Sequence, residues 1–294
     1  MYKFTVAIPT FNSSDYLKEC ILGFRNSKFV DEILIGDDCS DRNELSNVES
    51  IIQETRTIMN CEIKLIKNKN NIGAFKNKYN LIINSKNEWV YQIDSDNVPF
   101  KNIDGIIKNI IDENSGEKYI YYPTKLIQFR KYKKIAKVFS TFQKKYRVVF
   151  SNKSLIINME KTKEAVLENV AYENEKEASE DSESFPELDS KFFKEKHIFW
   201  VLNCGNFIVN KKPFKKNMKK GLNYERDLLS MDAVVFSYLW LLNNGSIKLI
   251  QGLSHYHRKR YDSVSYTEIE PTIKSRQYFT NKIINKEWLK LWTL

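Results

Sequence analysis

The sequence has few of the residues that mark secreted, zinc-binding or membrane-spanning proteins. It has four cysteines, Cys20, Cys39, Cys61 and Cys204, and none of them forms a Cys-x-x-Cys pair. This spacing argues against structural zinc and indicates a reduced, cytoplasmic protein. No signal peptide is expected, because strand-like alternation begins directly after Lys3. The longest apolar stretch, near residues 231–242, is shorter than the roughly 20 residues that cross a bilayer, so no membrane span is expected.

Acidic residues are in the minority. The chain has 47 Lys and Arg against 37 Asp and Glu, which gives a net charge of +10 and favours phosphorylated ligands, anionic membrane surfaces or nucleic acid. Basic residues mixed with aromatic ones concentrate in residues 130–147 and 211–220. Such a mixture can bind RNA or an anionic interface, although a solvated lysine face over a core-facing aromatic stripe is more common.

The first part of the chain alternates between strand-like and helix-like segments. With 294 residues, 42% of them hydrophobic, the chain can form one large α/β domain or two small ones. Apolar runs predict strands at residues 4–11, 32–36, 62–66, 89–93 and 119–122. Apolar residues at helical spacing predict helices between them, at residues 14–24, 45–52, 75–83 and 103–111. This order predicts a parallel sheet covered by helices on both faces.

Polar residues follow the ends of four of these predicted strands. They are Asn12, Asp37, Asp38, Gly73, Asp94 and Asp96. Ligands of parallel sheets bind beyond the carboxyl ends of the strands, so these residues are expected at one edge. Carboxylates next to a buried strand need a cation or hydrogen-bond donors to offset their desolvation. The simpler interpretation of Asp94 and Asp96 is an Asp-rich turn.

The second half of the chain is less regular. Residues 172–190 are dense in Glu, Asp and Ser and predict an exposed loop, either a solvated linker or a lid over an acceptor. Residues 197–209 regain strand character and are expected to rejoin the sheet.

Four segments resemble, in order, the motifs of the family 2 glycosyltransferases of GT-A fold. They are residues 6–12 (VAIPTFN), 35–41 (IGDDCSD), 71–77 (NIGAFKN) and 93–97 (IDSDN). Asn77 stands where the family often has arginine, and Asn97 where a further aspartate is common. The resemblance implies a Rossmann-like, mostly parallel sheet flanked by helices. It also implies a nucleotide-sugar-binding half, residues 1–124, and an acceptor-binding and catalytic-base half, residues 125–294, within one GT-A domain.

The resemblance assigns the first two segments to the nucleotide. It implies that Pro9, Thr10 and Asn12 border the nucleotide and that Asp38 hydrogen-bonds the base, which would be N3 of uracil. A carboxylate suits this contact because it accepts from an N–H donor. For one of Asp37 and Asp38, an Asx-turn before the next helix is expected instead.

The resemblance assigns the next two segments to the diphosphate and a metal. Gly73 would let the backbone approach the ligand, although a turn glycine with positive φ explains it equally well. Lys76 is a candidate phosphate contact, and a surface lysine is the alternative. Asp96 would bind Mg²⁺ or Mn²⁺ directly, while Asp94 binds the ribose or the metal through water. Such ions commonly bind through one or two carboxylates plus substrate phosphates.

The apolar segment 228–242 resembles the family helix whose aspartate is the catalytic base. Asp232 matches that aspartate, and Met231 replaces the usual preceding glutamate. Asp227 and Glu225 are the alternatives, in a stretch where acidic residues also favour a helix N-terminus.

Residues 255–265 resemble the family's Y-x-H-R loop with trailing serines. The resemblance implies that His257 or Arg258 contacts the diphosphate or metal and that the loop folds over the donor, excluding water. For His255 a place in a basic surface loop is the favoured interpretation.

Together these features predict a metal-dependent, inverting glycosyltransferase that uses a UDP-linked or similar nucleotide-diphosphate sugar. The expected acceptor is a hydroxyl of a glycan or lipid-linked saccharide in cell-surface polysaccharide biosynthesis. Peripheral contact with an anionic membrane is also expected from the basic aromatic region, whereas nucleic acid is a disfavoured partner. The alternatives are a noncatalytic glycan- or nucleic-acid-binding protein on the same scaffold and a sugar-nucleotide pyrophosphorylase.

Overall fold

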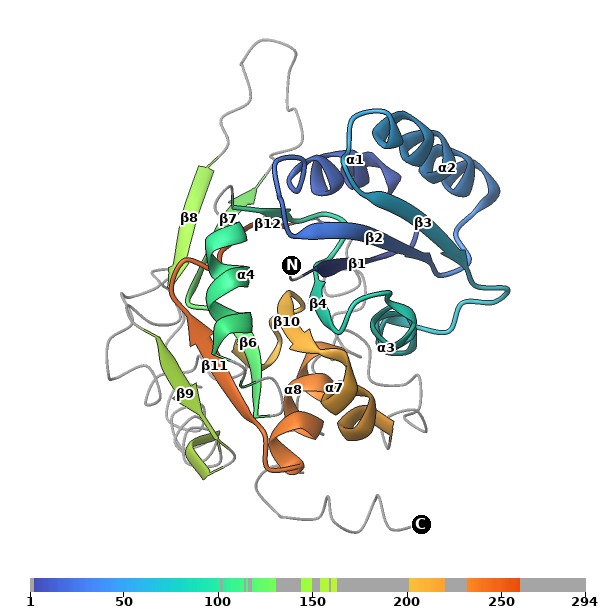
Figure 1. Cartoon of the computed structure of the whole chain (residues 1–294). Helices are drawn as coiled ribbons and strands as arrows, with labels where there is room; N and C mark the ends of the chain where they lie inside the picture. Colours follow the sequence, from blue (N-terminus) through green and yellow to red (C-terminus); the bar gives the residue numbers. More distant parts are fainter. Residues whose placement is uncertain are drawn as a thin grey trace, which may run out of the picture.

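The protein is an α/β structure with two sheets (Figure 1). The computed structural model describes residues 3–100, 103–113, 115, 118–130, 144–149, 154–158, 160–162, 201–219 and 232–259. Within these residues, a large sheet of eight strands has helices on both faces, and a smaller sheet has four strands. The predicted mostly parallel, helix-flanked sheet is therefore confirmed.

The large sheet has the strand order β3-β2-β1-β4-β10-β6-β11-β9. Its strands are β1 (Phe4–Thr10), β2 (Val30–Asp37), β3 (Glu62–Lys67), β4 (Trp89–Gln92), β6 (Tyr119–Pro123), β9 (Leu155–Ile157), β10 (Phe207–Asn210) and β11 (Ser246–Ile250). Strands β1 to β4 are mutually parallel, whereas β10 runs antiparallel between β4 and β6. The loop before β10 therefore reaches the same edge as the carboxyl ends of β1, β2 and β4.

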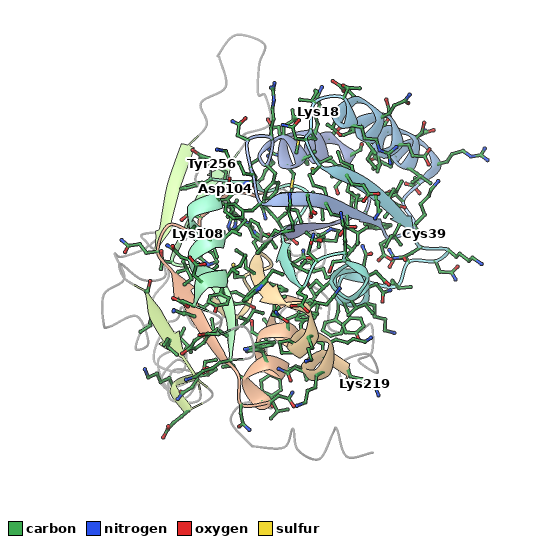
Figure 2. All side chains as sticks on the ribbon, viewed as in Figure 1. Lys18, Cys39, Asp104, Lys108, Lys219 and Tyr256 are labelled. Carbon is green, nitrogen blue, oxygen red and sulfur yellow. The ribbon has the colours of Figure 1, made fainter. Side chains whose placement is uncertain are left out.

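Helices cover both faces of this sheet, as predicted. The helices are α1 (Ser14–Leu22), α2 (Arg42–Arg56) and α4 (Ile103–Asp112) on one face, and α3 (Ala74–Asn84), α7 (Lys211–Met218) and α8 (Asp232–Leu242) on the other. Side chains fill the space between sheet and helices, while Lys18 projects from the outer surface of α1 (Figure 2). Among the helices that the structure describes, none is both long and apolar enough to cross a membrane.

Helix α8 is buried on all sides, which explains the long apolar stretch in the sequence. Every residue from Ala233 to Leu241 is buried, so the helix packs inside the hydrophobic interior rather than on the surface. Asp232 is its first residue, where a carboxylate is favoured by the helix dipole. The apolar packing of α8 thus fixes the position of the predicted base.

The small sheet was not predicted. It consists of β5 (Val98–Pro99), β12 (His255–Lys259), β7 (Lys125–Arg130) and β8 (Lys144–Val149), in that order. Because β5 directly follows the Asp94 turn and pairs with β12, this sheet brings the resembled Y-x-H-R segment to the aspartates.

The structure also refines the second half. In the described part of the segment 197–209, β10 rejoins the sheet as expected. Val201 and Leu202 are helical rather than extended. The acidic segment 172–190 and the alternative bases Glu225 and Asp227 lie outside the described residues.

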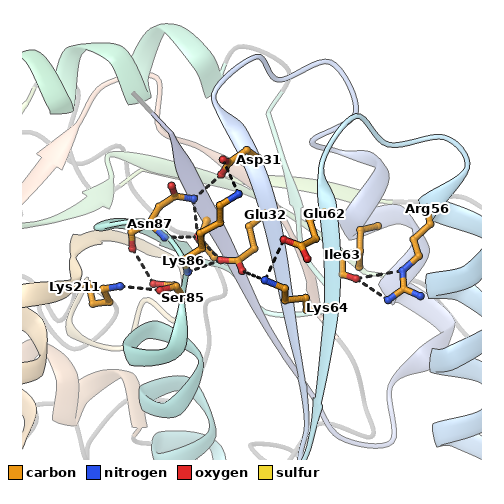
Figure 3. Close-up of polar contacts among 11 residues, drawn as sticks. Asp31, Glu32, Arg56, Glu62, Ile63, Lys64, Ser85, Lys86, Asn87 and Lys211 are labelled. Atoms are coloured by element: carbon orange, nitrogen blue, oxygen red, sulfur yellow. Dashed lines mark hydrogen bonds and ion pairs between the residues drawn. The ribbon is translucent and has the colours of Figure 1, made fainter. Parts of the chain in front are cut away.

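A polar network holds the amino ends of the strands together (Figure 3). The buried carboxylate of Glu32 accepts from Thr5 Oγ1 at 2.7 Å, from Lys86 N at 2.7 Å and from Lys64 Nζ at 3.1 Å. Asn87 Nδ2 in turn donates to Thr5 Oγ1 at 3.0 Å. A buried carboxylate with this many donors is stable, so this edge has a structural role.

Candidate active site

The chain turns sharply directly after β4, and Asp94 and Asp96 lie on this turn. A hydrogen bond of 3.0 Å from Asn97 N to the Asp94 carbonyl closes the turn. Asp94 N donates to Oδ1 of Asn206 at 2.8 Å, which ties the turn to the loop before β10. Asp94 and Asp96 are both partly exposed, whereas Ser95 and Asn97 are buried. The turn therefore presents its two aspartates to solvent and buries the two residues that alternate with them.

A buried lysine joins Asp94 to Asp232. Nζ of Lys78, on α3, lies 2.8 Å from Oδ1 of Asp94 and 2.7 Å from Oδ2 of Asp232. Burial alone would lower the pKa of Lys78, but the carboxylates of Asp232 and Asp94 outweigh it and raise the pKa above its ordinary value. The ammonium therefore stays charged. This one cation contacts both a carboxylate of the predicted donor site and the predicted base.

The loop before β10 encloses Asp94 from the other side. A Cβ at Gly205 would lie only 2.4 Å from Oδ2 of Asp94, so a larger residue would displace the carboxylate. Gly205 and Asn206 were not singled out in the sequence. In the sequence they can be recognised as a small residue followed by a polar one, immediately before a strand that rejoins the sheet.

Asp37 and Asp38 both stabilise loops at the carboxyl end of β2. Asp37 Oδ2 accepts from Ser40 N at 3.1 Å, which is the expected Asx-turn. Asp38 reaches further: its Oδ1 accepts from Ile72 N and its Oδ2 from Gly73 N, each at 2.9 Å. Asp38 therefore fixes the loop before α3, and its predicted contact with a nucleobase stays a prediction.

Hydroxyl groups connect the end of β1 to the aspartate turn. Thr10 Oγ1 lies 3.0 Å from Ser13 Oγ, which lies 2.9 Å from Ser95 Oγ. Ser13 is the N-cap residue of α1, but its side chain makes no capping bond and joins this chain instead. All three hydroxyls are buried, so the two strand ends are held at a fixed separation.

The segment after β1 has an unusual backbone. Asn12 and Cys39 adopt left-handed φ values of 46° and 66°, which non-glycine residues seldom do outside turns and functional sites. Asn12 N donates to Ser40 Oγ and Asn12 Oδ1 accepts from Asp41 N, both at 2.9 Å. Beside them Phe11 is 47% exposed, which is unusual for a large apolar side chain in the described residues.

Helix α3 corrects one detail of the sequence comparison. Asn77, which was assigned to the position where the family often has arginine, is buried, and its Nδ2 donates to the Gly36 carbonyl at 2.9 Å. The next residue, Lys78, supplies the positive charge that faces Asp94, and it was missed. Lys76 is only partly buried, and its phosphate contact stays a prediction. Gly73 has φ of 85° with open space around its Cβ position, so the backbone conformation requires glycine there.

The favoured interpretation of His255 as a surface residue is wrong. His255 is buried, and its Nε2 lies 2.7 Å from Asn206 Nδ2. Because Oδ1 of Asn206 accepts from Asp94 N, the amide nitrogen must donate to His255. The imidazole is therefore neutral with its proton on Nδ1, and it supports the aspartate turn from behind.

His257 and Arg258 lie on β12 beside the same turn. Arg258 N donates to Asn97 Oδ1 at 3.1 Å, and its guanidinium lies 4.2 Å from the ring centroid of Tyr16 and pairs with Glu19. The Arg258 side chain thus faces α1, and His257 is partly exposed. A contact of either residue with a diphosphate or metal stays a prediction.

The free energy of unfolding should fall as pH drops below about 6.5. Burial lowers the pKa of His255 well below its ordinary value, and His257 lowers it further, so the folded protein stays neutral there while the unfolded chain takes up a proton. This one group then costs up to about 1.4 kcal/mol per pH unit. Urea unfolding at about pH 7 and about pH 5.5 measures the loss.

His255→Gln is the matched control for this pH dependence, because an amide oxygen can accept the Asn206 bond at either pH. The variant should lose less stability over the same pH interval. An equal loss in both proteins would contradict the assignment.

The aspartate turn offers carboxylate oxygens to a metal. Asp94 and Asp96 are both partly exposed there, and Oδ1 of Asp94 lies 2.8 Å from Nζ of Lys78. Direct metal binding by Asp96 stays a prediction. In the part of the chain that the structure describes, no group of three or more His, Cys, Asp and Glu could hold a metal ion unaided. Mg²⁺ and Mn²⁺ often bind through a single carboxylate when substrate phosphates complete the shell. The residues therefore fit an ion that arrives with a diphosphate.

Comparisons with known proteins bear on the family and the fold. The family model described as Glycosyl transferase family 2 matches residues 5–163. The S. aureus TarS 1–349 structure in complex with UDP-GlcNAc is 17% identical, with a TM-score of 0.54, over 96% of this chain and 70% of that chain. The TarS 1–349 complex with UDP is 16% identical, with a TM-score of 0.51, over 96% and 69%. These similarities show a shared fold. No curated protein matches the sequence significantly.

Proposed function

The chain belongs to glycosyl transferase family 2, and on that premise we propose that it transfers a sugar from a nucleotide-diphosphate donor to an acceptor hydroxyl with inversion at the anomeric carbon. The observation that carries the proposal is the meeting of Asp94, Lys78 and Asp232 at the carboxyl edge of the sheet. A donor site and a base have to be adjacent for a single displacement, and these residues come from the turn after β4, from α3 and from α8.

The donor half of the proposal rests on the loops after β1 and β2. Asp38 has two bonds at Oδ1 and one at Oδ2, so Oδ2 keeps a lone pair for the N–H of uracil. Pro9, Thr10 and Asn12 would border the nucleotide, as the sequence predicts. The exposed ring of Phe11 offers a surface on which a base can stack.

Phe11→Ala is expected to weaken UDP binding by about 5- to 150-fold, because stacking on an aromatic ring contributes about 1–3 kcal/mol per base. Isothermal titration with UDP and Mn²⁺ measures the change. Ile156→Ala is the control, since Ile156 is also a large exposed apolar residue but lies on edge strand β9. Equal UDP affinities in the Phe11 variant and the wild type would exclude the stacking role.

The chemistry follows from the carboxylates. Asp232 would remove the proton of the acceptor hydroxyl as its oxygen attacks the anomeric carbon opposite the diphosphate. One in-line displacement inverts the configuration, through a transition state with oxocarbenium character. A divalent ion held by Asp96 would neutralise charge on the departing nucleoside diphosphate. Asp94, fixed by Lys78 and Asn206, would position the ribose or a metal-bound water.

UDP-GlcNAc is the first donor to test, because it is the ligand of the TarS complex with the same fold. The proposed acceptor, a hydroxyl of a glycan or lipid-linked saccharide in cell-surface polysaccharide biosynthesis, rests on the family resemblance. Contact with an anionic membrane rests on the basic residues of 130–147, half of which lie outside the described residues.

A thermal-shift screen of nucleotide sugars with and without Mn²⁺ tests the donor proposal. A ligand that binds only the folded state raises Tm, because it stabilises that state. The stabilisation is about 2.7 kcal/mol when the ligand concentration is 100 times Kd. We expect a manganese-dependent shift with UDP-sugars that exceeds the shift with other nucleotides. The absence of a shift with every nucleotide sugar, together with tight binding of RNA, would support the noncatalytic alternative.

A further inference from the structure

We infer that Lys78 is a positioning residue that sets the location of the catalytic base relative to the donor turn. The inference rests on the proposed function, because Asp232 acts as a base only if the chain transfers a sugar to a hydroxyl. It goes beyond that function because it assigns a role to a buried side chain that need not contact the donor.

Lys78 connects three elements that are each anchored independently. Helix α3 is pinned to β2 by the bond from Asn77 to Gly36, and the Asp94 turn is held by Asn206. Asp232 begins α8, whose position is set by its apolar core packing. The two contacts of Lys78, at 2.8 and 2.7 Å, are therefore the direct polar link between the donor turn and the base.

The charge of Lys78 holds two neighbouring carboxylates in place. Asp94 and Asp232 contact the same nitrogen, so their carboxylates lie close together. Like charges repel each other, and the buried ammonium between these two offsets that repulsion. Removing the ammonium should therefore let the base move away from the donor turn.

The ammonium also orients the base. Oδ2 of Asp232, which Lys78 contacts, is buried, while the side chain as a whole is 18% exposed. The exposed part of the side chain therefore lies away from the oxygen that Lys78 contacts. We expect an acceptor hydroxyl to approach from that exposed side without displacing Lys78.

The amino edge of the sheet shows how the same fold buries a carboxylate for structure alone. Glu32 there is satisfied mainly by a hydroxyl and a backbone N–H, and its lysine partner, Lys64, is 45% exposed. At the candidate site, by contrast, one lysine that is only 7% exposed serves two carboxylates. Lys64 thus provides a matched control, a lysine with two carboxylate neighbours outside the site.

The test compares Lys78→Met, Lys78→Arg and Lys64→Met in the full chain, using nucleoside diphosphate release with Mn²⁺. In Lys78→Met we expect kcat to fall about 10²- to 10³-fold, the loss typical of a preorganised charged or hydrogen-bonding group. The donor KM should change only a few-fold. Lys78→Arg should recover much of the lost kcat, because a guanidinium also carries a positive charge that can contact two carboxylates. Lys64→Met should match the wild type throughout.

Folding is followed by circular dichroism and thermal melts, with Lys78→Gln as a second neutral variant that can still donate hydrogen bonds. A folded Lys78→Met or Lys78→Gln protein with the wild-type kcat would overturn the inference. Failure of both neutral variants to fold would reduce Lys78 to a structural residue and would also overturn it. If the wild type itself releases no nucleoside diphosphate from any donor, the proposed function fails first, and this result is distinct from the others.

Discussion

Asp232→Asn should lower kcat for glycosyl transfer by about 10²- to 10⁴-fold, the contribution of a general base, and leave donor affinity nearly unchanged. Asparagine keeps the size of the side chain and can still accept a bond from Lys78, but it cannot take a proton from the acceptor. The loss should therefore appear in kcat rather than in the donor KM. Initial rates of transfer, with donor Kd from calorimetry, measure both quantities.

Asp112→Asn is the control for this variant. Asp112 ends α4 and pairs with Lys108, an exposed lysine on its own helix, so its substitution should leave kcat unchanged. If Asp232→Asn keeps nearly the full kcat, Asp232 is not the base, and Asp227 and Glu225 become the candidates.

Asp96→Asn should reduce activity by about 100-fold or more, because a Lewis-acid metal contributes several kcal/mol at the leaving group. The same variant should need a higher Mn²⁺ concentration for half-maximal activity. Manganese binding in the presence of UDP, followed by electron paramagnetic resonance, gives a readout that does not depend on turnover. Removing metal from the wild type with EDTA should abolish activity, and adding Mn²⁺ should restore it.

Asp94→Asn separates the two aspartates of the turn. Asp94 is paired with Lys78. This variant should therefore change the Mn²⁺ concentration for half-maximal activity much less than Asp96→Asn does. Equal manganese affinities in Asp96→Asn and the wild type would contradict the assignment of Asp96 as the ligand.

The first half of the fold was predictable because the spacing of apolar residues there matches the alternating strands and helices of the structure. The helix 103–111 was predicted from isoleucines at helical spacing, and Ile103, Ile107, Ile110 and Ile111 are buried in α4. The small sheet was not predictable in the same way. β5 has only two residues, too few for alternation to be visible, and its partners β12 and β7 are distant in the sequence.

The site was predictable as an edge but not as a set of contacts. The rule for parallel sheets placed Asp38, Asp94 and Asp96 together because each follows the end of a strand. Lys78 was missed because lysine on a helix usually lies in solvent. The sequence nevertheless carries a signal: Lys78 is three residues after Phe75 and four before Ile82, on the buried stripe of α3. A charged residue on that stripe needs a buried partner.

Asn206 and His255 could not be found from local sequence. Their contacts join residues 112 and 49 positions apart, and depend on β10 lying between β4 and β6. The contact between Asp94 and Lys78 weakens the noncatalytic alternative, which rested partly on Asn77 replacing a basic residue, because the neighbouring lysine supplies that charge.

The most direct test of the account is the rate of nucleoside diphosphate release from a panel of nucleotide sugars, beginning with UDP-GlcNAc, by the wild type, Asp96→Asn and Asp232→Asn. The account predicts manganese-dependent release by the wild type with at least one donor, and a loss of about 100-fold or more in each folded variant. Release that is equally fast in all three proteins, or absent with every donor while the wild type is folded, would contradict it.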